Sequence, residues 1–261
     1  MIDIPSRVGI SSPLFSFSDL EGTIQEISTH FKRWEVVAEL EHDSQTLLEK
    51  RDLLLASGLE ITIHAPFSDL NIASLDQRTR ELSVRRVGES IVAAHELGSS
   101  MVTMHPGFSS PLGIIAPGMV DDFNYESLSI LARKADEQNV SLALENMPPW
   151  RGSIGDDVWD LLKRIKGTGL KICLDIGHAH IGGSIDGFFE KTDLIANVHI
   201  HENDGKNDLH MPLGSYKSDL DVAAIMKKLD ERGYVGPFII ESRNLDEGVK
   251  SLDYLRDRLS D

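Results

Sequence analysis

The sequence predicts a (β/α)8 barrel, a single TIM barrel of eight parallel strands that alternate with helices. Short apolar runs rich in Val, Ile and Leu, typical of strands buried on both faces, alternate with segments of helical periodicity along the whole chain. The length of 261 residues is close to the roughly 250 that such a barrel takes. A His, Asp or Glu closes one apolar run after another, as expected where strand ends gather on one rim. We therefore expect one domain over residues 1–261.

The expected elements follow one another in regular alternation. The strands lie near residues 7–10, 35–40, 60–64, 101–105, 140–145, 170–175, 195–201 and 237–241. The helices lie near residues 18–31, 44–57, 76–97, 122–138, 156–166, 184–192 (a weak one), 219–232 and 245–259. Gly58, Gly98, Gly169 and Gly233 come just after helical segments, where a residue that tolerates the left-handed conformation often ends a helix.

An open, doubly wound sheet is the alternative architecture. It would more often have a Gly-rich phosphate-binding turn after its first strand, whereas here the sequence SSPLFSFS follows. The segment 106–121 is interpreted as an extended loop over the rim, because it is rich in Gly and Pro. Such a loop would suit a lid.

Charge and cysteine content narrow the class of protein. The chain has 26 Lys and Arg against 42 Asp and Glu, a net charge of -16, which disfavours a nucleic acid partner. The lone Cys173 lies in an apolar run, so we expect a buried residue and a reducing compartment. The sequence has neither a basic, apolar leader nor an apolar run of the roughly 18 residues that span a membrane. We expect a soluble, cytoplasmic protein.

Nine residues with nitrogen or oxygen donors lie at or near the ends of the expected strands. They are His64, His105, Glu145, Asp175, His178, His201, Asp208, His210 and Glu241. Because these strand ends meet on one rim, we expect a metal centre there. Mixed histidine and carboxylate sites accept several divalent metals, and we expect one to three ions of Zn2+ or Mn2+. For His64, His105 and Asp208, a role around a single ion, outside its ligand set, stays open.

Two histidines of the seventh expected strand are two residues apart. His199 and His201 therefore point the same way, one layer above the other inside the barrel. We interpret His201 as the ligand and His199 as an internal histidine that is hydrogen-bonded within the barrel. His30, His42, His95 and His180 are assigned no function.

The spacing of these residues resembles that of the xylose isomerase-like barrel superfamily, and the resemblance covers nearly the whole chain. This superfamily contains sugar and sugar phosphate isomerases and epimerases together with endonuclease IV. The stretch HIHENDGKNDLHMPLG at 199–214 is similar to the HxHxNDGxxDxHxxPG pattern of the isomerase-like branch. The resemblance implies that Glu145, Asp175, His201 and Glu241 hold one ion. In endonuclease IV-like members the other five positions complete a trinuclear zinc cluster.

The resemblance implies a metal-dependent isomerase or epimerase of carbohydrate metabolism that acts on a sugar or sugar phosphate through an enediolate. Glu145 and Glu241 resemble the catalytic pair of the epimerase branch. The alternative is an endonuclease IV-like zinc phosphodiesterase that acts on abasic-site DNA. Against it stand the acidic charge, a short 203–214 segment whose only cation is Lys206, and Phe67 where endonuclease IV-like chains tend to have Tyr. A noncatalytic metal-binding barrel is a third possibility.

Four residues near the ligands are candidates for substrate binding. Arg151 and Arg243 have the side chain that holds a phosphate or carboxylate, although a solvated Arg paired with a nearby acid explains them equally. Phe67 and Trp150 are placed to cover the apolar face of a sugar, with ordinary packing between loops as the alternative.

Overall fold

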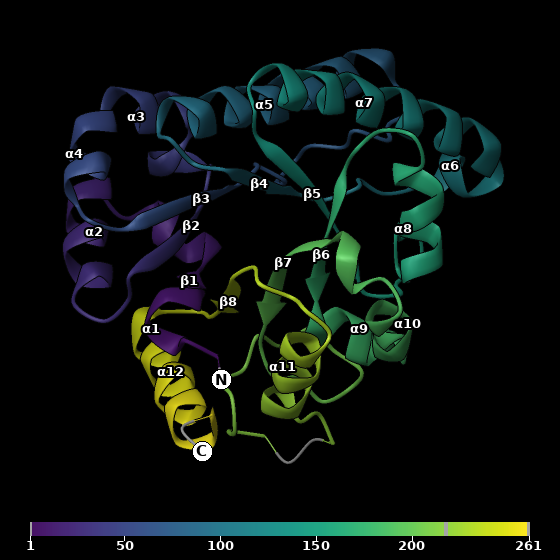
Figure 1. The fold of residues 1–261 in the computed structure, drawn as a ribbon. Helices are drawn as coiled ribbons and strands as arrows, with labels where there is room; N and C mark the ends of the chain where they lie inside the picture. The colour runs from purple at the N-terminus through teal and green to yellow at the C-terminus, as the bar shows by residue number, and fades with distance from the viewer. Residues whose placement is uncertain (1, 217–218, 260–261) are drawn as a thin grey trace.

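The computed structural model describes residues 2–216 and 219–259 and has the predicted barrel architecture (Figure 1). The strands are β1 Val8–Ser11, β2 Arg33–Val37, β3 Glu60–His64, β4 Met101–Met104, β5 Ser141–Glu145, β6 Lys171–Asp175, β7 Ile195–Ile200 and β8 Phe238–Glu241. They form a closed barrel in sequence order, and the parallel pairing of β1 with β8 closes it. All eight expected strands are confirmed, with bounds that differ by a few residues at most.

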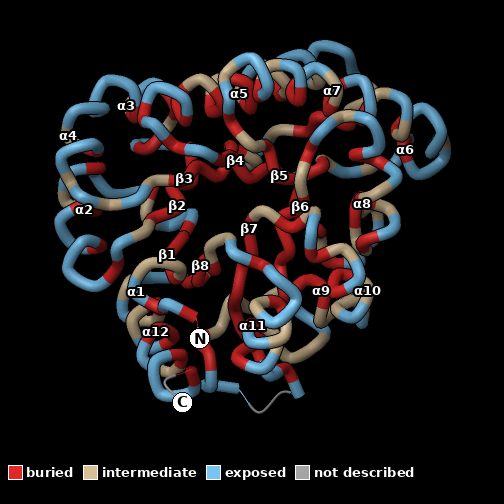
Figure 2. The backbone as a smooth tube through the Cα atoms, in the orientation of Figure 1, coloured by how far each residue is buried: buried red, intermediate tan, exposed pale blue. Residues whose placement is uncertain are grey.

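The helices surround the barrel. They are α1 Ile4–Arg7, α2 Leu20–Ser28, α3 Ser44–Glu49, α4 Arg51–Ala56, α5 Gln77–Glu96, α6 Pro111–Ile115, α7 Pro117–Glu137, α8 Val158–Ile165, α9 Ile176–Gly182, α10 Ile185–Phe189, α11 Val222–Glu231 and α12 Leu245–Leu259. Three short 3-10 helices, Pro13–Phe17, Leu40–His42 and Thr192–Leu194, lie between them. Figure 2 shows the strands buried at the centre and the exposed residues on the outer sides of the helices. None of the helices in the described part of the chain could cross a membrane.

The prediction of an extended loop over residues 106–121 is wrong. Helix α6 and the first turn of α7 lie there, and each begins at a proline, Pro111 or Pro117. Proline suits the first position of a helix, because the N–H that it lacks would have no helical partner there. Ser110 also caps α6 by accepting a hydrogen bond from the N–H of Gly113. The prolines therefore begin helices instead of breaking them.

A small apolar cluster lies inside the barrel below some of the polar strand ends. Met101, Ala143 and Cys173 form a buried apolar cluster separate from the main core. Side chains two residues apart on a strand lie on the same side, so Ala143 precedes Glu145 and Cys173 precedes Asp175 on the inward face. The buried thiol agrees with the prediction for Cys173. The cluster forms an apolar floor beneath Glu145 and Asp175.

Candidate metal centre

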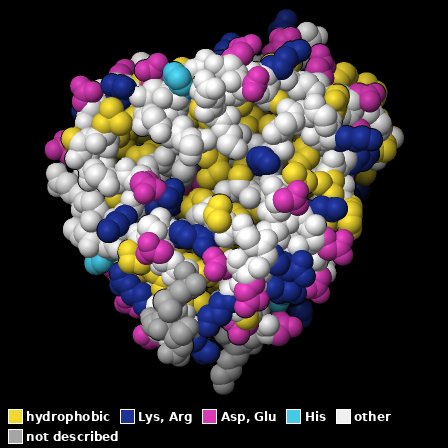
Figure 3. Space-filling view, in the orientation of Figure 1, with side chains coloured by type: hydrophobic (Ala, Val, Ile, Leu, Met, Phe, Trp, Pro, Cys, Tyr) yellow, Lys and Arg dark blue, Asp and Glu magenta, His cyan; other side chains and the backbone are white. Residues whose placement is uncertain are grey.

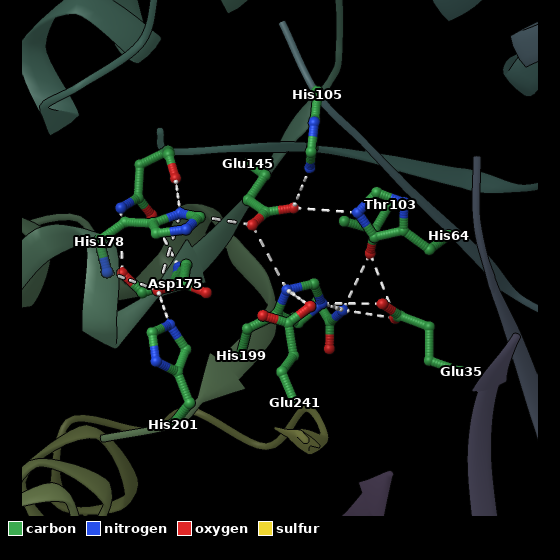
Figure 4. A network of polar contacts seen from close by, with 12 residues as sticks. Glu35, His64, Thr103, His105, Glu145, Asp175, His178, His199, His201 and Glu241 are labelled. Carbon is green, nitrogen blue, oxygen red and sulfur yellow. Dashed lines mark hydrogen bonds and ion pairs between the residues drawn. The ribbon is translucent and has the colours of Figure 1, made fainter. Parts of the chain in front are cut away.

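The predicted ligands come together at the carboxyl ends of the strands, where the described residues form four groups, and three of these groups include Glu145. Figure 4 shows most of the residues concerned. One group consists of Glu145, Cys173 and His199, so the buried thiol also lies beside the site. The His64 group consists of His64, His105 and Glu145. The Glu241 group consists of Glu145, Asp175, His199 and Glu241. The Asp208 group consists of His178, His201, Asp208 and His210. Within each group, one potential ligand atom per residue lies within 4.8 Å of all the others.

The His64 group is centred on one oxygen of Glu145, which ends β5. Glu145 Oε2 lies 3.1 Å from His64 Nε2 and 3.4 Å from His105 Nε2. The other ring nitrogen of His64, Nδ1, lies 2.8 Å from the carbonyl oxygen of Ala65. This second contact turns Nε2 towards Glu145, as the outer hydrogen bond of a metal-binding histidine does.

The Asp208 group joins the segment after β6 to the loop after β7. Asp208 Oδ2 lies 3.3 Å from His178 Nε2 and 3.1 Å from His210 Nε2, and Oδ1 lies 3.4 Å from His201 Nε2. The loop is held by Asp204, whose Oδ1 accepts hydrogen bonds from the N–H groups of Lys206 and Asn207. His178 is held by a 2.8 Å contact between Nδ1 and the carbonyl oxygen of Asn146.

The resemblance implies a quartet of ligands, Glu145, Asp175, His201 and Glu241. The Glu241 group contains His199 in place of His201. His199 Nδ1 lies 3.2 Å from Glu241 Oε1 and 3.5 Å from Glu145 Oε1, whereas His201 joins the Asp208 group and lies 3.3 Å from Asp175 Oδ1. His199 is internal and bonded, as expected, because its Nε2 lies 2.8 Å from Glu35 Oε1. Its Nδ1, however, faces the metal centre. The two-residue spacing on β7 was the signal that placed both histidines on this side.

Several buried polar atoms of the site have no hydrogen-bond partner in the described part of the chain. They are Asp175 Oδ2, His199 Nδ1, both ring nitrogens of His201, and Asp208 Oδ1. Buried polar atoms are bonded in the great majority of cases, so unpaired ones that face each other call for a cation. Imidazole and carboxylate donors suit zinc, manganese and related ions. The residues present therefore fit a divalent metal centre.

The raised pKa values of two histidines in the metal-free protein also favour a cation site. Burial opposes the charged form of His178, but the charges of Asp175, Asp208 and Glu145 outweigh it and raise the pKa to about 10. For His210, burial is likewise outweighed by Asp208 and Glu241, and the pKa rises to about 9. Protons on these rings balance the carboxylates, and metal binding would release them.

A cavity of about 320 Å3 adjoins the His64 group, and His105 is part of its lining. Phe67, Trp150 and Arg151, three of the four predicted substrate-binding residues, also line it. The Phe67 ring stacks on His105 with centroids 4.7 Å apart. The loop that carries Phe67 is held by Glu39, whose Oε1 accepts 2.7 Å hydrogen bonds from the N–H groups of Phe67 and Ser68.

Arg243, the fourth predicted substrate-binding residue, has a different position. Its guanidinium donates hydrogen bonds of 2.9 and 2.7 Å to the carboxylate of Glu247, in the first turn of α12. It is absent from the lining of the cavity. Arg243 precedes α12 and reaches forward to its first turn, so the pairing with a nearby acid that the sequence left open is the one found.

Comparisons with known proteins identify the family of this barrel. A family model described as "Xylose isomerase-like TIM barrel" matches residues 29–258. A crystal structure of a D-tagatose 3-epimerase-like protein is similar with a TM-score of 0.89 and 33% identity, over 97% of both chains. An uncharacterized protein of Methanocaldococcus jannaschii is 35% identical over 97% of this chain and 89% of its own length. A probable endonuclease 4 of Mycobacterium leprae is 28% identical over 82% of this chain and 85% of its own.

Proposed function

Since this chain belongs to the xylose isomerase-like TIM barrel family, we propose that it is a divalent-metal-dependent isomerase or epimerase of a ketose sugar or sugar phosphate. The observation that carries the proposal is the Glu241 group, which sets carboxylate oxygens of two glutamates from different strands within 4.8 Å of each other. The similarity to an epimerase-like protein at 33% identity supports it. Carbohydrate metabolism in the cytoplasm, by one domain over residues 1–261, is part of the same proposal.

The quartet Glu145, Asp175, His201 and Glu241 would hold the principal ion, Zn2+ or Mn2+. His199 is a further candidate because its Nδ1 faces the same carboxylates. When bound, the ion would polarise a substrate carbonyl and stabilise negative charge on its oxygen. The other predicted ligands would hold one or two more ions or orient the quartet.

The two glutamates would move the proton that the reaction requires. Removal of a proton from the carbon next to a carbonyl gives an enediolate, and its return to the other face or to the neighbouring carbon gives an epimer or isomer. The side chain of Glu241 is 13% exposed and that of Glu145 is 2% exposed. Glu241 is thus the more accessible to a substrate that enters from the mouth, and Glu145 lies deeper.

The cavity lined by Phe67, Trp150 and Arg151 would bind the rest of the substrate. Aromatic faces pack against the C–H side of a sugar ring, and a guanidinium binds a phosphate through paired hydrogen bonds. Arg243 is ion-paired with Glu247, so it could bind substrate only after this ion pair breaks.

Hydrogen exchange tests the proposal. The metal-loaded protein is incubated in heavy water with a panel of ketoses and ketose phosphates, and NMR detects deuterium on the carbon next to the carbonyl. Enediolate chemistry introduces deuterium there even where net conversion is slow, whereas hydrolysis does not. Absence of exchange across the panel would refute the proposal.

An endonuclease IV-like phosphodiesterase is the second candidate. The division of the predicted ligands between several groups favours it, because several ions could activate water and bind both phosphate and leaving oxygen. The net charge of -16 opposes it, and the face seen in Figure 3 mixes acidic with basic side chains. Cleavage of an abasic-site duplex across a salt series decides between the two.

A further inference from the structure

A buried polar network lies beneath the metal centre, inside the barrel. It contains Glu35 from β2, Thr103 from β4, and Asn197 and His199 from β7, all of them 0% exposed (Figure 4). The Glu35 carboxylate lies 2.8 Å from His199 Nε2, and it accepts hydrogen bonds of 2.7 Å from Asn197 and 3.3 Å from Thr103. A carboxylate deep in a barrel is costly to desolvate unless its partners compensate.

The network determines which nitrogen of His199 faces the metal centre. A carboxylate accepts hydrogen bonds only, so the ring nitrogen next to Glu35, Nε2, carries a proton. The opposite nitrogen, Nδ1, is therefore directed at Glu241 and Glu145, at 3.2 and 3.5 Å. Nδ1 has no hydrogen bond within the described residues. Glu35 thus controls the orientation of a ring that touches two predicted ligands.

We propose that Glu35 is a positioning residue that acts through His199 to hold the Glu241 and Glu145 carboxylates in place for a divalent metal ion. This inference rests on the proposed function. At the level of this network Ala143 pairs with Thr103 and Cys173 pairs with Asn197, so apolar residues also fill this part of the barrel interior. Because apolar packing often replaces a buried ion pair without loss of stability, folding alone does not explain a charge here.

Cobalt titration tests the proposal, because visible absorption of Co2+ reports both affinity and ligand geometry. Glu35→Gln keeps the size of the side chain and removes its charge, and we expect affinity to fall about 10- to 100-fold, as for other outer partners of metal ligands. Thr62→Val is the matched control. Thr62 contacts the same carboxylate through a weak 3.4 Å hydrogen bond from another strand and does not touch His199.

A double-mutant cycle tests whether Glu35 acts through His199. His199→Asn removes the contact with Glu35, so adding Glu35→Gln to this variant should change cobalt affinity less than about twofold. NMR of the metal-free protein gives a readout that a purely structural role would not change. The Nε2–H signal of His199 should be protected from exchange in the unmodified protein and in Thr62→Val, and should exchange faster in Glu35→Gln, because a neutral amide oxygen accepts a weaker hydrogen bond than a carboxylate. If Glu35→Gln does not fold, Glu35→Asp, which withdraws the carboxylate by one methylene, replaces it.

The outcomes separate this inference from the proposed function. If the unmodified protein binds no divalent metal, the proposed function fails and this inference fails with it. If it binds cobalt but Glu35→Gln binds equally well, only the positioning role is overturned. Equal weakening by Thr62→Val, or additive effects in the cycle, would also overturn it.

Discussion

The side chain of Asp175 accepts a 2.6 Å hydrogen bond from the backbone N–H of His178. Asp175 thereby caps the amino end of α9 while it lies in the Glu241 group. The cap uses Oδ1, and Oδ2 has no hydrogen-bond partner among the described residues. One residue thus ends β6, caps α9 and keeps a carboxylate oxygen without a hydrogen bond among the described residues.

Substitutions of Asp175 should separate these roles. Asn can still accept the capping hydrogen bond but lacks the charge, so Asp175→Asn should lose metal while keeping α9. Asp175→Ala should lose the cap as well and be less stable than Asp175→Asn by about 1 kcal/mol. Elemental analysis and thermal unfolding of the metal-free variants measure the two effects. Full metal content in Asp175→Asn would contradict the assignment.

The protein purified without chelators should contain at least one tightly bound divalent ion per chain, and two or three if every group is occupied. Glu241→Ala should release the principal ion. His105→Ala and His210→Ala should leave it in place, and they should remove only additional ions if those are present. Elemental analysis of the four proteins gives the stoichiometry. Retention of all metal by Glu241→Ala would remove Glu241 from the quartet.

Amide variants should abolish the proposed proton transfer. Glu145→Gln and Glu241→Gln roughly preserve the shape of the side chains but cannot accept the proton, so deuterium incorporation should fall by about 10²- to 10⁴-fold. NMR of the ketose measures it, and metal content is measured in parallel to separate loss of the ion from loss of the base. Exchange at the original rate in both variants would exclude them as the catalytic pair.

Gly177 in α9 should not tolerate a side chain. A Cβ at this position would collide with the imidazole of His201. Because the collision displaces the His201 ring, we expect Gly177→Ala to weaken metal binding. Helix propensity alone would make the same substitution stabilising by about 1 kcal/mol. Gly182→Ala in the same helix is the control, because its Cβ would come no closer than 3.4 Å to another atom. Cobalt titration compares the two, and equal affinities would mean that the His201 ring moves freely.

His42 should make stability depend on pH independently of metal. Burial lowers its pKa to about 4, and its ring packs edge-on against Trp34. In the unfolded chain the His42 imidazole has an ordinary pKa of about 6.5 and binds the proton more readily than in the folded protein. The folded protein therefore becomes less stable as the pH falls from about 6.5 to 4. His42→Phe should flatten the curve in that window. Denaturant unfolding across pH measures it, and parallel curves for both proteins would contradict the prediction.

The barrel and the meeting of the nine predicted ligands could be predicted from the sequence because strand position determines both. A run such as ICLD specifies where β6 ends, and parallel strands in a barrel end at one rim. The depth of a side chain along the barrel axis is harder to predict. Alternation shows that His199 and His201 share a side of β7, yet only the register of neighbouring strands brings His199 to Glu241.

Other differences arise from contacts between distant segments. Glu35 was not identified from the sequence, because its partners on β4 and β7 are far away along the chain. In the 106–121 segment the error came from proline, which is common in loops but here occupies the first position of both helices.

The predicted ligands lie at the carboxyl ends of the strands, so the opposite end of the barrel lies away from them. Substitutions at that opposite end would change how well the chain folds without reaching the chemistry, whereas the loops at the mouth could vary with little effect on the core. A lineage could therefore acquire a new specificity by exchanging loops around Phe67 and Trp150 while it inherits the same ligands. The scaffold is conservative at one end and adaptable at the other.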